Sequence, residues 1–170
     1  MEPGLDRLNS LPANEAESEF GKCCGSTNWA RRMVGERPFT NSNDLVTLAD
    51  RIWWSLEPDD WLEAFASHPK IGENIAARVS LAEAQSWAAQ EQAGGQNAKA
   101  ETGRSLAELN REYEDKFGYI YIVCATGKSS EEMLAILRER LPNDAETELR
   151  IAAREQARIT KLRLGKLINQ

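Results

Sequence analysis

Residues 57–69 read EPDDWLEAFASHP, and this stretch contains a complete helix between a start signal and a stop signal. Pro58 and the two acidic residues after it are typical of a first helical turn. Proline loses no hydrogen bond there, and carboxylates face the positive end of the helix dipole. Pro69 restricts His68 to extended backbone angles and so ends the helix. The stretch therefore predicts a short helix that presents the only histidine of the chain at its C-terminal end.

Start and stop signals of the same kind recur along the rest of the chain. Asn14 is expected to cap one helix, and Ser26 or Thr27 the next. Residues 129–132 form a capping box, whereas the polar segment 96–103 predicts a loop. Beyond the stretch quoted above, the predicted helices cover residues 5–11, 14–24, 27–34, 42–53, 80–93, 106–117, 130–141 and 143–168.

Residues 119–125, YIYIVCA, are the exception to this helical pattern. They are β-branched and aromatic, and apolar on both faces, which predicts a buried extended segment. A lone strand has no partner, so helix ends, side chains or a ligand must satisfy its backbone groups. We find no internal repeat and no linker long enough to divide the chain. The expected fold is therefore all-α, a single compact multi-helix domain over residues 1–170 with one short buried extended segment.

The net charge and the sequence limit the classes of molecule that the chain is expected to bind. A net charge of −6 and a sequence pI of about 5.0 argue against a nucleic-acid surface, which normally carries a basic patch. They do not exclude an anionic small molecule, because one arginine in a pocket outweighs a diffuse acidic surface. The chain shows no signal peptide, no apolar run that could cross a bilayer and no C-terminal peroxisomal tripeptide. We therefore expect a cytoplasmic protein that binds neither nucleic acid nor membranes.

The cysteines indicate a reducing compartment. Cys23, Cys24 and Cys124 give an odd number with an adjacent pair, which is no disulfide framework. A metal site is not expected, because the adjacent pair lacks the usual spacer and the chain has a single histidine.

His68 is the first candidate for chemistry, because an imidazole both takes and gives a proton near neutral pH. Its expected partner is a carboxylate that sets its charge and orientation, and Glu91 is the best candidate. Glu91 follows Trp87 by four residues and falls on the apolar face of its predicted helix, where desolvation perturbs the pKa of a carboxyl group. The structural alternatives are a half-buried cap for His68 and a solvated charge for Glu91.

Arg163 is the second candidate. In the last predicted helix it follows Gln156 by two turns along an apolar stripe, where a guanidinium could bind a carboxylate through two hydrogen bonds. The alternative is an arginine that stabilises the C-terminal end of the helix. The other charged residues of this helix are expected to form a solvated face, and the tryptophans to lie in the core. These residue types by themselves predict an acid–base pair with an anion clamp.

Four segments together resemble one known family, in that family's order and with approximately its spacing. They are residues 61–72 (WLEAFASHPKIG), residues 91–92 (EQ), residues 117–127 (FGYIYIVCATG) and residues 155–164 (EQARITKLRL). Each segment is weak alone, and the four together are highly specific. From about residue 20 to its end, the chain resembles the 2-oxo-4-hydroxy-4-carboxy-5-ureidoimidazoline (OHCU) decarboxylases of urate breakdown.

The resemblance implies an all-helical, cofactor-free and usually dimeric enzyme. It implies that the product of 5-hydroxyisourate hydrolysis loses carbon dioxide and becomes (S)-allantoin. The family's catalytic histidine, glutamate and arginine match His68, Glu91 and Arg163. The residues expected to line the substrate pocket are Pro69, Gln92, Ile120, Tyr121, Ile122 and Val123, the last four through their backbone.

One position departs from the family pattern. Many members have serine three residues before the glutamate, where this chain has Ala88, so a hydrogen bond to substrate is absent or replaced by water or Ser86. Two alternatives therefore stay open: a related decarboxylase acting on another ureido or heterocyclic acid, and a non-catalytic helical binding module on the same scaffold. Ala88 favours the binding module. The decarboxylase is favoured more strongly, by the joint presence of His68, Glu91, Gln92 and Arg163.

Overall fold

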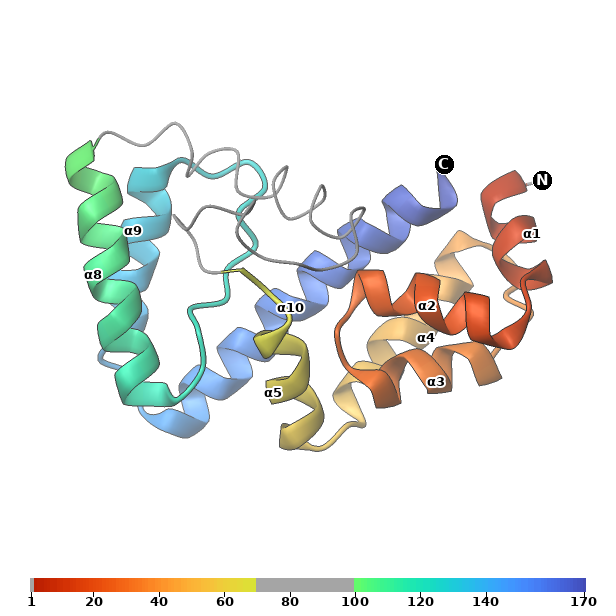
Figure 1. Cartoon of the computed structure of the whole chain (residues 1–170), viewed down its shortest axis with the longest axis horizontal. Coiled ribbons are helices and arrows are strands. Elements are labelled where there is room, and N and C mark those ends of the chain that lie inside the picture. The colour runs from red at the N-terminus through yellow and green to blue at the C-terminus, as the bar shows by residue number, and fades with distance from the viewer. Residues whose placement is uncertain (1, 70–99) are drawn as a thin grey trace. The chain divides into compact units, whose positions relative to one another are not determined.

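The computed structural model describes residues 2–69 and 100–170, which form eight helices and no strand (Figure 1). The predicted all-α class is confirmed. None of the described helices is long and apolar enough to cross a membrane. The predicted helix over residues 80–93 lies outside the described residues. The helices are α1 (Pro3–Ser10), α2 (Ala13–Cys23), α3 (Thr27–Gly35), α4 (Ser42–Trp54), α5 (Pro58–Ala66), α8 (Ala100–Phe117), α9 (Ser130–Arg140) and α10 (Ala145–Ile168).

Side-chain caps begin four of these helices, and in α10 the carboxylate of Asp144 accepts a hydrogen bond from the N–H of Thr147. Ser26, rather than Thr27, caps α3, because its hydroxyl oxygen accepts a hydrogen bond from the N–H group three residues later. Asn41 caps α4 in the same way. The predicted capping box begins α9, where the Ser129 hydroxyl accepts from the N–H of Glu132.

Several predicted helix boundaries are wrong: the first helix begins at Pro3 rather than at residue 5, and the last begins at Ala145 rather than at residue 143. Two further differences have a plain physical reason. Asn14 does not cap α2: the helix begins one residue earlier, because Pro12 already supplies the extended backbone (ψ 150°) of an N-cap position. The second half of the loop expected over residues 96–103 is helical, since α8 begins at Ala100. Gly103 costs this helix only about 1 kcal/mol, which good helix formers on either side outweigh.

The described residues fall into two compact units, and the first comprises residues 2–64 and 157–170. In this unit α2 packs against α3, and α3 against α4 (Figure 1). The core is aromatic, with the ring of Phe20 edge-on to the rings of Trp29 and Phe39 at centroid distances of 5.9 and 6.1 Å. The indole N–H of Trp29 donates to the carbonyl oxygen of Ala49, so this buried polar group is satisfied.

The tryptophans only partly follow the prediction that they lie in the core. Trp29 and Trp53 are buried, whereas Trp54 is 42% exposed and meets the ring of Trp61 edge-on. Successive residues of a helix point about 100° apart, so Trp53 and Trp54 cannot both face the same core. Trp87 lies outside the described residues.

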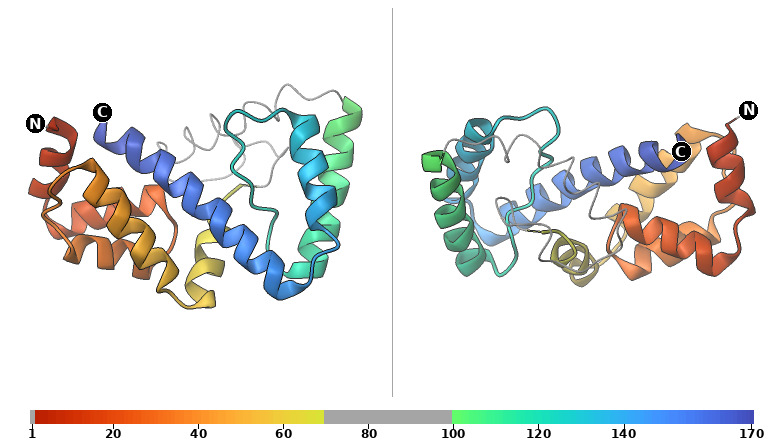
Figure 2. Two further views of the ribbon diagram at one scale, coloured as in Figure 1. Left: turned by 180° about the vertical axis from the view of Figure 1, so that it is seen from behind. Right: turned by 45° about the horizontal axis from the view of Figure 1, so that its top comes forward.

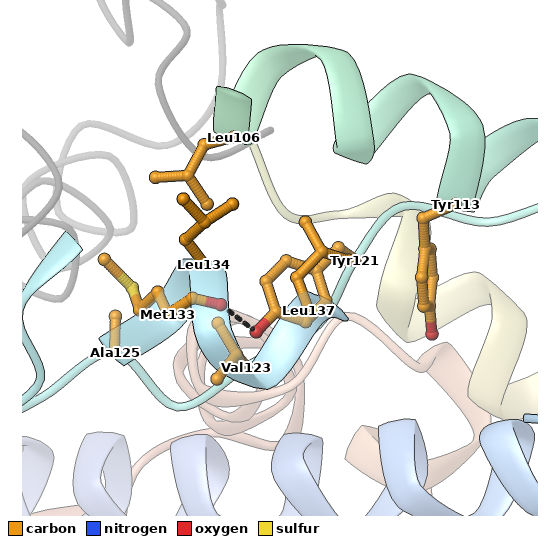
Figure 3. Close-up of a cluster of buried hydrophobic side chains, with 8 residues drawn as sticks. All are labelled: Leu106, Tyr113, Tyr121, Val123, Ala125, Met133, Leu134 and Leu137. Carbon is orange, nitrogen blue, oxygen red and sulfur yellow. Dashed lines mark hydrogen bonds between the residues drawn. The ribbon is translucent and has the colours of Figure 1, made fainter. Parts of the chain in front are cut away.

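The second unit comprises Phe65–Gln156. In it α8 and α9 lie side by side in all views (Figure 1 and Figure 2). Residues 121, 123 and 125 of the connecting segment add their side chains to the same cluster, as the two-residue period of an extended chain requires. The buried side chains of this cluster are Leu106, Tyr113, Tyr121, Val123, Ala125, Met133, Leu134 and Leu137 (Figure 3).

The predicted extended segment is present between α8 and α9, and it pairs with no strand in the part of the chain that the structure describes. Gly118 stops α8 and Gly127 ends the segment, with φ values of 83° and 77°. Only glycine adopts such left-handed angles without strain. The segment is therefore held by groups other than a neighbouring strand. The expectation of a single domain stays a prediction.

Candidate active site

His68 lies directly after α5, as the sequence predicted. Its backbone N–H donates to the carbonyl oxygen of Phe65 over 3.2 Å, which closes the last turn, and Pro69 follows it. The side chain of His68 is buried, with 8% of the residue exposed, and Pro69 is half-buried. An imidazole so placed has a restricted orientation and limited access to water.

The imidazole of His68 contacts Gln156 on α10. The distance from Nε2 of His68 to Oε1 of Gln156 is 2.5 Å, and Gln156 is fully buried. An amide oxygen can only accept, so with this placement of the amide the proton sits on Nε2 and Nδ1 is the basic nitrogen of the neutral ring. The sequence placed Gln156 on the same stripe as Arg163 but did not select it as a site residue. The sequence feature that could have identified Gln156 is a polar amide on an otherwise apolar helix face.

The backbone of residues 120–123 lies in the same unit as His68. Tyr121, Ile122 and Val123 are buried and Ile120 is half-buried. The ring of Phe65, at the end of α5, lies 5.2 Å from the ring of Tyr119, so the start of this segment packs against the helix that precedes His68.

Side chains satisfy two carbonyl groups of the segment, as the sequence required. Arg140 donates from Nη1 to the oxygen of Ile122 over 2.7 Å, and Lys128 donates to the oxygen of Cys124 over 2.8 Å. The hydroxyl of Tyr121 in turn donates to the carbonyl oxygen of Met133 on α9 over 2.9 Å (Figure 3). The segment is thus anchored from α9 and the turn before it.

A buried charge cluster adjoins this segment, and the sequence did not predict it. Arg140 and Glu148 form an ion pair whose side chains are 7% and 0% exposed. The expectation of a solvated face on α10 is therefore wrong for Glu148 and for Glu155, which is 6% exposed. Glu148 and Glu155 are two turns apart and therefore lie on the same side of α10, and only packing decides whether that side is covered.

Arg140 stays charged in this cluster, and the tyrosine hydroxyl groups beside it stay neutral. Burial is the largest influence on Arg140 and opposes its charged form, but the hydrogen bond to Glu148 and the electrostatic interactions with Tyr113, Glu148 and Tyr121 together outweigh burial and raise the pKa of the guanidinium. Burial raises the pKa of the hydroxyl groups of Tyr113 and Tyr121. Both phenols therefore stay neutral and act as hydrogen-bond donors at ordinary pH.

Arg163 lies in the first unit, on the C-terminal half of α10, and is 6% exposed. Two buried thiols lie near it. Burial raises the pKa of Cys23, and raises that of Cys24 to about 11, while the positive charge of Arg163 opposes both shifts. The buried position of Arg163 excludes a purely solvated role at the end of the helix.

The predicted site residues are thus distributed over three parts of the chain. His68, Pro69 and residues 120–123 belong to the second unit, and Arg163 belongs to the first. Glu91 and Gln92 lie outside the described residues. In residues 2–69 and 100–170, no cluster of three or more His, Cys, Asp or Glu side chains could hold a metal ion.

Most of this chain is similar in sequence to known proteins. Residues 9–165 match the sequence model of the family described as OHCU decarboxylase. The chain is 38% identical over 154 residues to the uric acid degradation bifunctional protein TTL of Arabidopsis thaliana, covering 90% of this chain and 47% of that protein. It is 31% identical over 165 residues to the 2-oxo-4-hydroxy-4-carboxy-5-ureidoimidazoline decarboxylase of Amia calva, covering 96% of this chain and 94% of that protein.

A solved structure shares the fold. The crystal structure of an OHCU decarboxylase in the presence of (S)-allantoin matches with a TM-score of 0.77 and 37% identity, covering 89% of this chain and 98% of that chain. The chain spans 47% of the Arabidopsis bifunctional protein and 32% and 33% of two bifunctional relatives from Bacillus. Since the family match extends over residues 9–165, this chain belongs to the OHCU decarboxylase family.

Proposed function

We propose that this chain decarboxylates 2-oxo-4-hydroxy-4-carboxy-5-ureidoimidazoline to (S)-allantoin without a cofactor, as a step of urate breakdown. The observation that carries the proposal is the match of residues 9–165 to the OHCU decarboxylase family. The 37% identity to an OHCU decarboxylase crystallised in the presence of (S)-allantoin supports the same substrate class.

The chemistry of this substrate suits a site of side chains alone. Its hydroxyl and carboxylate share one carbon, next to an imine carbon. When the bond to the carboxylate breaks, its electron pair forms a carbon–carbon double bond and the imine nitrogen takes a proton, which leaves an enol. The enol carbon that was the imine carbon must then receive a proton from one face, while the hydroxyl loses its proton to give the carbonyl. Positioning and proton transfer are therefore the tasks left to the protein.

His68 is the proposed proton carrier, with Glu91 setting its charge and orientation. The burial of His68 and its hydrogen bond to Gln156 support a fixed imidazole with one defined basic nitrogen. In this role it binds the substrate hydroxyl and moves the proton that the hydroxyl loses.

Arg163 is the proposed clamp for the anionic substrate. A buried guanidinium supplies up to five N–H donors in a fork that matches a carboxylate, and its charge stabilises negative charge as it moves during the reaction. Pro69, Gln92 and the backbone of residues 120–123 are proposed to line the pocket around the bound substrate.

We also propose a cytoplasmic homodimer. The three cysteines are free thiols, all buried, as suits a reducing compartment. Light scattering coupled to size exclusion tests the dimer, which has twice the 19.0 kDa mass of the chain. A particle of 19.0 kDa at micromolar concentration would reject it.

A coupled assay tests the function. Urate, urate oxidase and 5-hydroxyisourate hydrolase generate the substrate, and circular dichroism follows the optical activity of the allantoin formed with and without the chain. We expect (S)-allantoin at a rate far above the spontaneous one. A racemic product at the background rate would reject the decarboxylase.

The same assay assigns His68. His68→Asn keeps the size and polarity of the side chain but cannot carry a proton, so we expect loss of the stereospecific product. Asn169→His is the matched control, since it places an imidazole on an exposed position at the end of α10. A His68→Asn variant with the parent rate and the parent optical activity would remove His68 from the chemistry.

A further inference from the structure

Arg140 and Glu148 form an ion pair that is completely enclosed in the second unit. Arg140 is the last residue of α9, and Glu148 lies in the first turns of α10. Nε of Arg140 donates to Oε1 of Glu148 over 2.7 Å, and Nη2 lies 2.5 Å from the same oxygen in an ion pair. The same carboxylate accepts from the hydroxyl of Tyr113 over 2.5 Å and from the amide of Asn143 over 3.1 Å. Every oxygen of Glu148 is therefore occupied within the unit.

Stability alone gives little reason to bury such a pair. Removing two charges from water costs several kcal/mol for each ion, and apolar side chains of similar volume are often as stable or more so. What an ion pair supplies and apolar side chains do not is a set of directed hydrogen bonds. The hydrogen bonds that Arg140 and Glu148 make therefore indicate the role of the ion pair.

The remaining donor of Arg140 holds the backbone of the extended segment. Nη1 donates to the carbonyl oxygen of Ile122 over 2.7 Å. The guanidinium carbon lies 4.9 Å from the centre of the Tyr121 ring and 5.8 Å from that of Tyr113, so the cation also contacts two neighbouring aromatic rings. Among the described residues, each of the three side-chain nitrogens of Arg140 has a partner in this cluster.

Holding one carbonyl oxygen fixes the whole peptide unit. The peptide bond between Ile122 and Val123 is trans and planar, so the N–H of Val123 points opposite to the carbonyl that Arg140 holds. In the described part of the chain no strand pairs with this segment, so no ladder of hydrogen bonds there holds that direction. The hydrogen bond from Arg140 fixes the direction of this peptide unit, as hydrogen bonds from a neighbouring strand do in a sheet.

We propose that Arg140, held by Glu148, is a positioning residue for the reaction: it fixes the backbone of residues 120–123 so that this segment presents its N–H groups to the substrate. The proposal rests on the proposed function, which places residues 120–123 in the substrate pocket. A donor that binds substrate must be held within a fraction of an ångström, and a displacement of about 1 Å costs about 100-fold in rate.

Arg140→Lys is the main test. Lysine keeps the charge but has one nitrogen, so it cannot bind Glu148 and the carbonyl of Ile122 in the same fork. At a temperature where circular dichroism shows every variant folded, we expect a loss of about 10- to 100-fold in kcat/KM, most of it in kcat, and a lower enantiomeric excess of (S)-allantoin.

Leu45→Ala is the matched control for lost stability. Leu45 is fully buried on α4 in the other unit, so its truncation destabilises the protein without touching the segment. We expect Leu45→Ala to keep the parent kcat and enantiomeric excess. An Arg140→Lys variant with parent values, or equal losses in both variants, would overturn the positioning role.

Hydrogen exchange gives a readout independent of activity. Relative to the parent, the amide of Val123 should exchange faster in Arg140→Lys, because the side chain of residue 140 no longer holds the peptide. This acceleration should be at least about tenfold larger than the one in Leu45→Ala. If the parent makes no (S)-allantoin, the proposed function fails, and exchange alone still decides whether Arg140 anchors the segment. Unchanged exchange would reject the anchoring even in an active enzyme.

A double variant covers the case in which Arg140→Lys does not fold. Arg140→Met with Glu148→Met replaces the pair by apolar side chains, which buried ion pairs often tolerate. We expect it to fold and to show the same loss of kcat and of amide protection. A folded double variant with parent kinetics and exchange would reject the proposal.

Discussion

Nε2 of His68 lies 2.5 Å from Oε1 of Gln156, and both side chains are buried. The two residues are 88 positions apart in the sequence, at the end of α5 and in the middle of α10. This hydrogen bond assigns the tautomer of the only histidine through a neutral amide. A neutral partner leaves the imidazole free to change charge during a proton transfer.

Replacing the neutral partner by a carboxylate should make the imidazole harder to deprotonate. In Gln156→Glu a negative charge would lie beside Nε2 and stabilise the imidazolium, so the titration midpoint of His68 should rise by about one pH unit or more. Because the chain has one histidine, its imidazole proton resonance can be followed by NMR without further assignment. The acidic limb of the kcat profile should move to higher pH with it.

Gln170→Glu is the control, because it adds the same charge at an exposed position. It should leave the midpoint where it is in the parent. Equal midpoints in the parent and in Gln156→Glu would show that the two side chains do not meet in solution.

Removing the charge of Arg163 should weaken substrate binding or catalysis. Arg163→Met fills the buried space but has no donor, and we expect kcat/KM to fall about 30-fold or more, equivalent to about 2 kcal/mol for a lost hydrogen bond to a charged group. Steady-state kinetics with the coupled assay measures this. Arg154→Met, at an exposed position on the same helix, should have the parent kinetics, and an Arg163→Met variant that matches it would remove Arg163 from the site.

Two glycine substitutions in the first unit should change stability in opposite directions. A Cβ added at Gly4 would overlap the backbone carbonyl of Ile168, which cannot move as a side chain can, so Gly4→Ala should destabilise by about 1–3 kcal/mol. Gly21 lies in α2 with open space around it, so Gly21→Ala should stabilise by about 0.5–1 kcal/mol. Urea unfolding measures both, and a midpoint of Gly4→Ala at or above that of the parent would contradict the packing at Gly4.

The protein should lose stability in alkali beginning near pH 9. Burial raises the pKa of all three tyrosines and of Cys23, and raises that of Cys24 to about 11. The folded protein therefore keeps protons that the unfolded chain releases around the unperturbed values of 9.0 for cysteine and 10.0 for tyrosine. The free energy of unfolding is highest below pH 9 and falls as the pH rises above it.

Absorbance at 295 nm checks this directly. Phenolate absorbance of the folded protein at pH 10 should be well below that of the unfolded chain, and most of it should appear together with loss of the helical circular dichroism signal. In urea the same tyrosines should titrate near 10. Tyrosines that ionise near pH 10 while the protein stays folded would contradict their burial.

The sequence by itself determined the helical class, most helix boundaries and the position of His68. These features follow from local effects. Pro69 limits the backbone angles of the residue before it. Ser26 and Ser129 cap the helices that follow them, and Gly118 adopts the left-handed angles that end α8. The extended segment was equally clear, because β-branched and aromatic residues on both faces suit no surface helix.

The tertiary structure decided which side chains meet. Helical periodicity shows that Gln156 shares a face with Arg163, but it does not show that the end of α5 brings His68 to Gln156. Periodicity likewise gave no sign that Glu148 is buried against Arg140, since a charge on a helix is covered only if another element packs over it. Short-range rules fix each helix and its faces, whereas the pairing of faces depends on contacts between residues far apart in the chain, and those exist only once the chain is folded.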